Sequence, residues 1–301
     1  MSDRAGGTVW RTVHPGWRPL FVAFLALTSV ATVVLYVFSY DTDEVFAWTV
    51  LPAISAAFLG GGYAAGFVLV AGSARQRAWA GARIGVITIF LFTVATLLVT
   101  IGHRHRFHFG SGGFAGAAAW FWLAIYVVVP SGMAVMFVVQ RRVPGVDPPV
   151  QAPLSRWLSG LLAVQAVVLG ASGAVLLADP ARLLGGWPWA LTPLTARAVG
   201  AWCLPLGIAA GIAVGEHDAW RLRPAAATYV VLAALHAGAL VRFRTDVRWG
   251  VWGTWVYLAV LASMVVAGVA GLLRARAVDA PSPGATSGAE LSSERSAEPR
   301  R

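Results

Sequence analysis

Eight apolar segments, each about twenty residues long, set the strongest limit on how this chain can fold. Only 12% of its 301 residues are charged, whereas a typical soluble domain carries roughly 25%. A helix of about 20 residues crosses the hydrocarbon core of a membrane with its backbone hydrogen bonds satisfied internally. The sequence therefore predicts an all-α integral membrane protein with eight transmembrane helices, at 20–40, 50–71, 84–101, 114–139, 158–178, 193–215, 225–241 and 251–273.

The arginines in the loops predict the orientation of these segments. The sequence contains arginine but no lysine. Of the arginines outside the predicted spans and the C-terminal tail, thirteen lie on the side of the membrane that carries the N-terminus and six lie on the opposite side. Cytoplasmic loops carry an excess of Lys and Arg, so both termini are expected in the cytoplasm of a multi-pass protein of the cell membrane. The first segment is longer than the apolar part of a cleaved signal peptide, and no clear cleavage site follows it. It is expected to remain in the protein.

Residues recur at an offset of 140 or 141 positions along the chain. The recurrence predicts two tandem parallel four-helix repeats at 20–142 and 157–276, joined by a cytoplasmic linker at 143–156. A cytoplasmic segment at 1–19 precedes them, and the tail at 277–301 lacks apolar periodicity and is expected to be disordered. The matched pairs are Trp17/Trp157, Trp48/Trp189, Pro52/Pro193, Gly66/Gly207 and Trp79/Trp220.

Glycines spaced four residues apart indicate where the helices approach one another closely. Gly62 and Gly66 lie in the second segment, while Gly207, Gly211 and Gly215 share one face of the sixth. Small residues at this spacing let helix backbones pack tightly in lipid. The pattern favours helix packing, with a groove that admits a ligand as the alternative.

Polar residues inside the predicted spans are few. No Asp or Glu falls within a span, which disfavours proton-coupled transport because such transporters use buried carboxylates. Gln165 and His236 are the deeply placed polar residues; for His236, a hydrogen bond to a neighbouring helix is favoured over haem ligation or a proton relay. Arg197 lies one turn inside the sixth span, where it either reaches out to the interface or meets an anionic group.

The loop after the third segment reads "GHRHRFHFG" and combines histidines with arginines. His103, His105 and His108 have a spacing that could wrap around zinc or copper. The corresponding loop of the second repeat has no histidine, which disfavours a metal site. What both loops share is positive charge. This predicts an anion-binding or lipid-headgroup site made by Arg104, Arg106, Arg197, Arg242, Arg244 and Arg248.

Ion pairing within the loops competes with this site and is favoured over anion binding as the use of these arginines. The carboxylates available for such pairs on the same side are Asp41, Asp43, Glu44, Asp179 and Asp246. Cys203 is the only cysteine, which excludes an intrachain disulfide and disfavours a thiolate metal site.

The stretch "DPARLLGGWPWALTPLTARAVGAWCLPLGIAAG", from Asp179, resembles the DoxX-like group of small four-helix membrane proteins. The likeness rests on an Arg–small–aliphatic–Gly pattern, here Arg197 to Gly200, on a helix that follows a loop rich in Pro and Trp. It covers about one helix and its preceding loop, and the first repeat has Ala56 or Ala57 where Arg197 stands. Some members of the group are linked to membrane redox complexes, so the resemblance implies an accessory redox role and transfers no catalytic residue.

The sequence contains no Gly-rich phosphate loop, nucleophile elbow or metalloprotease helix. An enzyme is disfavoured and no cofactor is predicted. The favoured function is a structural, scaffold or lipid-handling role, with the bilayer and anionic headgroups as partners and no nucleic acid. Two alternatives stay open: carriage of a lipid or small apolar molecule through the interface between repeats, and an accessory subunit of a membrane redox system.

Overall fold

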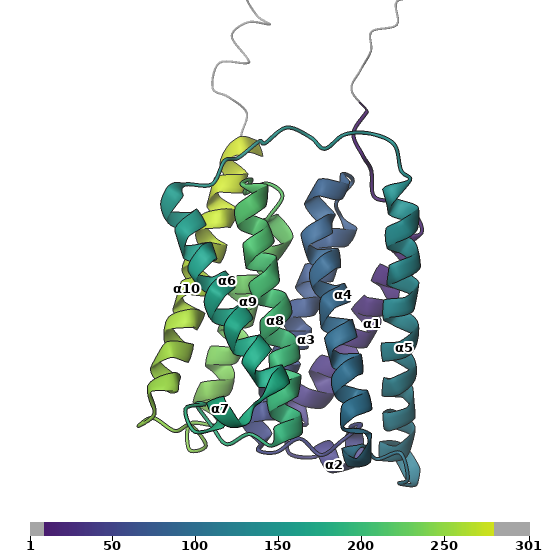
Figure 1. Ribbon diagram of the computed structural model, residues 1–301, viewed down its shortest axis with the longest axis vertical. Coiled ribbons are helices and arrows are strands. Elements are labelled where there is room, and N and C mark those ends of the chain that lie inside the picture. Colours follow the sequence, from purple (N-terminus) through teal and green to yellow (C-terminus); the bar gives the residue numbers. More distant parts are fainter. Residues whose placement is uncertain (1–8, 280–301) are drawn as a thin grey trace, which may run out of the picture.

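The computed structural model of this protein describes residues 9–279, which fold into a helical bundle without a β-strand (Figure 1). Within that range, eight helices are long and apolar enough to cross a membrane, so the chain is a polytopic membrane protein. Each of the eight predicted segments overlaps one of them. The helices are α1 (Trp17–Thr32, continued by a π-helical turn at Val33–Val37), α3 (Ala53–Ala74), α4 (Trp79–Gly102), α5 (Gly113–Arg141), α6 (Arg156–Ala178), α8 (Pro193–Glu216), α9 (Arg223–Arg242) and α10 (Trp252–Asp279).

The two ends of the bundle differ in what covers them (Figure 1). The first and last described residues and the connection between α5 and α6 lie at one end, called here the linker end. Three short helical turns lie in the loops of the other end, called here the short-helix end: α2 (Thr42–Val45), η2 (Arg104–Arg106) and α7 (Ala181–Leu184). The predicted start of the disordered tail at 277 is too early, because α10 continues to Asp279; the rest of that tail lies outside the described residues.

Local sequence signals explain where the most buried helices begin and end. The side chain of Thr192 accepts a hydrogen bond from the Thr195 N–H, and Pro193 follows at the first helical position of α8. His217 ends α8 with a left-handed backbone (φ 49°). Pro52 immediately precedes α3.

Helices α3 and α8 form the centre of the bundle. The buried share of the most apolar stretch is 78% in α3 and 56% in α8, and these are the highest values among the eight spans. Helix α3 packs against α1 and α9, and α8 packs against α6 and α4. The two segments that carry the predicted packing glycines are therefore the two most buried ones.

The predicted packing glycines contribute unequally. A Cβ atom on Gly207 would lie 2.3 Å from the Gly170 backbone nitrogen, and one on Gly62 would lie 3.0 Å from the Trp202 ring. A Cβ on Gly66 or Gly211 would meet its nearest atom at an ordinary 3.8 Å, and one on Gly215 would meet nothing within 4 Å. The spacing of four places these residues on one face, but the neighbouring helix approaches closely only near Gly62 and Gly207.

A network of charged side chains closes the linker end. Arg83 of α4 donates two hydrogen bonds to Glu216 at the end of α8, both at 2.5 Å, and also pairs with Asp147 of the linker. Arg221 donates to the same Glu216 carboxylate at 2.6 Å. Asp218 accepts backbone N–H bonds from the linker at Gln151 and Ala152. The network therefore joins α4, α8 and the linker.

The N-terminal segment also packs on the linker end, in the part that the structure describes. The Gln140 side-chain oxygen accepts hydrogen bonds from the His14 N–H (2.9 Å) and the Trp17 indole (3.2 Å), and its amide donates to the Thr12 carbonyl (2.8 Å). Trp17 is buried and begins α1, three residues earlier than predicted, whereas Trp157 is 56% exposed. The two matched tryptophans therefore have different environments.

Candidate functional site

An apolar groove between α4, α6 and α8 ends at an arginine. The groove has a volume of about 590 Å³, and Arg197 and His103 lie at its short-helix end. It is called here the Arg197 groove. Its walls are aliphatic and include Leu91, Leu98, Ala174, Leu177, Leu204 and Ile208.

Main-chain and imidazole acceptors fix the Arg197 guanidinium in this place. Its Nε donates a hydrogen bond to the Leu177 carbonyl at 3.1 Å, and its Nη1 lies 3.4 Å from His103 Nε2. Leu177 lies in the last turn of α6, where carbonyl groups lack helical partners and the helix dipole favours a cation. The Nη2 group makes no hydrogen bond within residues 9–279 and stays available to a ligand.

His103 acts on Arg197 as a neutral acceptor. Its Nδ1 lies 3.1 Å from the Val99 carbonyl, which only accepts hydrogen bonds, so Nδ1 carries the proton and the lone pair of Nε2 faces Arg197. Burial lowers the pKa of His103, and the positive charge of Arg197 lowers it further against the opposing effect of the Val99 bond. His103 is therefore uncharged at neutral pH, and it orients Arg197 without competing for an anion.

The six arginines predicted as a headgroup site fall into two groups. Arg104 and Arg106 form the exposed turn η2 directly after His103, next to Arg197. Arg242 instead donates to the carbonyls of Tyr36 (2.5 Å) and Val37 (3.2 Å) at the end of the first span. Arg248 donates to the Leu184 carbonyl at 3.2 Å, and Arg244 is exposed. No hydrogen bond or ion pair joins the two groups in the described part of the chain.

The favoured interpretation, ion pairing within the loops, is wrong for all six of these arginines in the described part of the chain. At the short-helix end, the structure between residues 9 and 279 has one ion pair, Arg182 with Asp179 at 2.9 Å. Asp41, Asp43, Glu44 and Asp246 pair with no arginine there. For Arg197, Arg242 and Arg248, carbonyl groups take the place of the carboxylates, because they are fixed acceptors within reach.

The three loop histidines do not converge. His108 contacts the Thr49 hydroxyl (3.2 Å) and the Phe46 carbonyl (3.1 Å), both in the loop before α3. The His103 and His105 rings lie with their centres 6.3 Å apart. Among the residues the structure describes, no three His, Cys, Asp or Glu side chains are grouped to hold a metal ion.

His236 lies at the contact between α9, α3 and α10. Its Nε2 lies 3.1 Å from the Phe58 carbonyl and must therefore donate, so its Nδ1 accepts from the Tyr257 hydroxyl at 2.9 Å. Gly61 leaves room for the ring, since a Cβ there would lie 2.9 Å from His236 Cδ2. Both ring nitrogens are engaged with neighbouring helices. Gln165, the other polar residue predicted within a span, donates to the Ser263 hydroxyl at 2.8 Å and ties α6 to α10.

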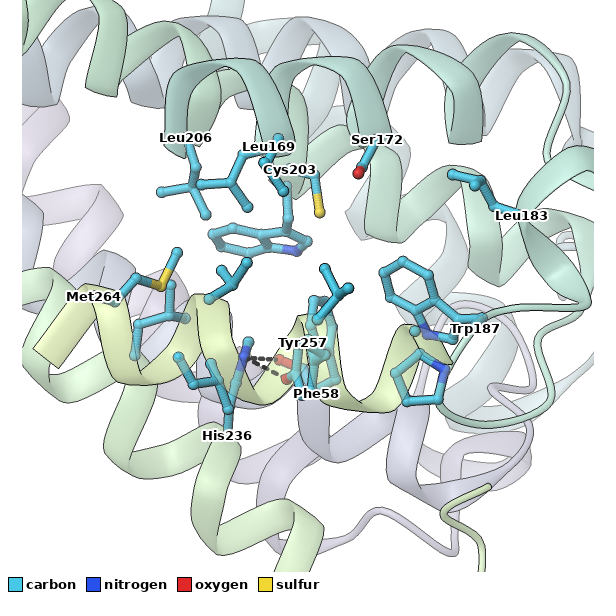
Figure 2. A pocket seen from close by; sticks show the side chains of 18 of the residues that line it. Phe58, Leu169, Ser172, Leu183, Trp187, Cys203, Leu206, His236, Tyr257 and Met264 are labelled. Carbon is cyan, nitrogen blue, oxygen red and sulfur yellow. Dashed lines mark hydrogen bonds between the residues drawn. The ribbon is translucent and has the colours of Figure 1, made fainter. Parts of the chain in front are cut away.

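A second cavity lies beside His236 and was not predicted from the sequence (Figure 2). It is called here the aromatic cavity and has a volume of about 110 Å³. Figure 2 shows Ser172 and Cys203 on one side of the space and the hydrogen-bonded His236 and Tyr257 on the other. The rings that line it belong to Phe58, Trp187, Trp202, Trp252 and Tyr257.

Comparison of the chain with protein-family models, curated proteins and solved structures finds no match. The resemblance to the DoxX-like group therefore stays a prediction. The fold and the two apolar sites define a polytopic helical membrane protein with an arginine-capped groove.

Proposed function

We propose that this protein handles lipid and binds an anionic lipid in the Arg197 groove. The observation that carries the proposal is an arginine held at one end of an apolar groove, with its Nη2 donors unused. A guanidinium group binds phosphate oxygens through parallel N–H bonds. The phosphate would lie at Arg197, within reach of the exposed Arg104 and Arg106, and an acyl chain would follow the aliphatic walls.

The length of the groove matches a lipid that belongs to a single leaflet of the bilayer. Arg197 and Ile208 line it eleven residues apart on α8, which corresponds to about 16 Å along the helix axis. One leaflet contributes about 15 Å of a hydrocarbon core of roughly 30 Å. An acyl chain anchored at Arg197 would therefore reach about the middle of the bilayer.

Replacing Arg197 with glutamine is expected to remove bound anionic lipid. In nanodiscs of phosphatidylglycerol and phosphatidylcholine, native mass spectrometry should find phosphatidylglycerol retained by the parent protein. Its apparent affinity should fall about tenfold or more in Arg197→Gln, because a hydrogen bond to a charged group contributes roughly 1.5–3 kcal/mol. Arg182→Gln is the matched control, since Arg182 is exposed at the same end and pairs with Asp179. Equal retention by the two variants would contradict the site.

We also propose that the bundle consists of two tandem parallel four-helix repeats. The packing of α3 against α1 and α9 corresponds to that of α8 against α6 and α4. Tyr36 and Leu177 are 141 positions apart, and the carbonyl of each accepts a hydrogen bond from an arginine. An apolar cavity of about 580 Å³ lies between α1, α3 and α5, and the aromatic cavity borders the corresponding helices of the second half. These correspondences support the duplication.

The arginine distribution supports placing both termini in the cytoplasm, with the linker end facing inward. Alkaline phosphatase fused after Tyr40 or Ala178, at the short-helix end, is expected to be active in a bacterial host. Fusions after Gln76 or Val143, at the linker end, are expected to be inactive, because the enzyme folds only outside the cytoplasm. The reverse pattern of activity would contradict this orientation.

The two alternative functions have less support. A redox role through His236 would need a ring nitrogen for a metal centre, and both nitrogens are engaged with Phe58 and Tyr257. Carriage through the interface between the repeats would need an open route. A further apolar cavity of about 70 Å³ lies next to the aromatic cavity, and the Trp202 ring packs against Gly62 between the two. The lipid-binding groove is therefore preferred.

A further inference from the structure

The aromatic cavity has the size of a single ring and borders the surface that faces lipid. Its volume of about 110 Å³ is close to that of an engineered cavity of roughly 150 Å³ that binds benzene. Trp252 and Val256 of α10 line the cavity and are 65% and 43% exposed. A small apolar molecule could therefore enter from the bilayer, between α6 and α10, without crossing water.

Four hydrogen-bond donors on residues that line this cavity have no partner in the described chain: the Ser172 hydroxyl and the indole N–H groups of Trp187, Trp202 and Trp252. Several hydroxyl groups in the spans bond to a carbonyl four residues earlier, as Thr88 does to Ile84 (2.7 Å) and Thr228 to Pro224 (2.8 Å), although those of Ser73 and Ser159 have no partner. Ser172 makes no such bond, and Figure 2 shows its hydroxyl directed toward the cavity. The indole N–H of Trp187 is buried without a partner. Buried polar groups normally find partners, so the Trp187 N–H points to a ligand, and the Ser172 hydroxyl is placed to bind the same ligand.

Two of the acceptors around the cavity are already used. The Phe58 carbonyl accepts from His236, and His236 Nδ1 accepts from the Tyr257 hydroxyl. Cys203 contributes a thiol, which is a weak donor and a weak acceptor. The Ser172 hydroxyl can donate or accept, whereas the buried and unpaired Trp187 N–H can only donate, so a ligand that pairs with both groups brings an acceptor oxygen.

We infer that the aromatic cavity is a second binding site, separate from the Arg197 groove, for a single-ring apolar molecule that carries a carbonyl oxygen. The ring packs among the aromatic side chains, and the oxygen accepts a hydrogen bond from the Ser172 hydroxyl or the Trp187 indole N–H. Such a ligand supplies what the cavity lacks: apolar volume and a hydrogen-bond acceptor.

Two probes of nearly equal shape test this assignment. 4-Fluoroacetophenone carries a carbonyl, and 1-ethyl-4-fluorobenzene has a methylene group in its place. Fluorine NMR line widths would be measured with the full chain in nanodiscs and with empty nanodiscs, which correct for partition into lipid. The ketone is expected to bind about fivefold more tightly than the hydrocarbon, as one hydrogen bond provides. Equal binding of the two would overturn the ligand class, and broadening no greater than in empty nanodiscs would overturn the site.

Variants then locate the hydrogen bond. Ser172→Ala combined with Trp187→Phe is expected to abolish the fivefold advantage of the ketone while both probes still bind. Ser131→Ala and Trp120→Phe are the matched controls on the exposed face of α5, where the two donors bond to the carbonyls of Val127 and Phe109. An advantage that survives in the cavity variant, or disappears in the controls, would contradict the role of these donors. Thermal unfolding of all three variants would verify that they are folded.

Discussion

Replacing Glu216 with alanine is expected to lower the free energy of unfolding by about 3–5 kcal/mol, which is typical of breaking a buried ion-pair network by removing one partner. Two guanidinium groups, those of Arg83 and Arg221, would lose the same carboxylate. The Glu216 and Arg221 side chains are only 8% and 9% exposed, so water replaces the lost partner poorly. Chemical denaturation in detergent micelles, followed by circular dichroism, would measure the change.

An exposed ion pair provides the control for this prediction. Asp179→Ala removes the partner of Arg182 at the short-helix end, where the two side chains are 53% and 76% exposed. Such a pair contributes about 0–1 kcal/mol, so this variant should unfold almost as the parent does. Similar losses in Glu216→Ala and Asp179→Ala would show that the linker-end network does not hold the two halves together.

The sequence does not predict this network, although it predicts the helices that carry it. A run of apolar residues can cross a membrane only as a helix, so composition alone locates the eight spans to within a few residues. The partners of Arg83 lie 64 and 133 positions away, at Asp147 and Glu216. Only the packing of α4 against α8 brings them together. From the sequence, the linker-end arginines Arg83 and Arg221 indicate only the orientation of the spans.

The short-helix end shows a different limit of sequence analysis. Arg197 could be identified as an unusual charge within a span, but its partner is a main-chain carbonyl, a group that every residue carries. His103 was noted for its spacing to other histidines, whereas in the structure it accepts a bond from Arg197, 94 positions away. The aromatic cavity was missed because a serine in a membrane helix is ordinary. The free hydroxyl of Ser172 becomes apparent only when its neighbours are known.

Replacing Gly207 with alanine is expected to destabilise the protein by about 1–3 kcal/mol, the usual cost of overpacking a tight core. The new Cβ would lie 2.3 Å from the backbone nitrogen of Gly170 and 2.7 Å from its Cα. Both are backbone atoms, so no side-chain rotation relieves the clash and α6 must move away from α8. The midpoint temperature of thermal unfolding should fall. The variant should also lose its tertiary structure at a lower concentration of lysolipid or denaturing detergent than the parent protein does.

Two glycines on the same face of α8 provide matched controls, because they share the spacing of Gly207 but not its contacts. A Cβ on Gly211 would meet the Ala166 Cβ at 3.8 Å, and one on Gly215 would meet nothing within 4 Å. Alanine forms helix better than glycine by about 1 kcal/mol, so Gly215→Ala should be neutral or stabilising, and Gly211→Ala close to neutral. If all three variants lost the same stability, the spacing of small residues would determine packing, and the close approach at Gly170 would not. A loss confined to Gly207→Ala would show that, among these three glycines, only Gly207 lies in the tight contact of α6 and α8.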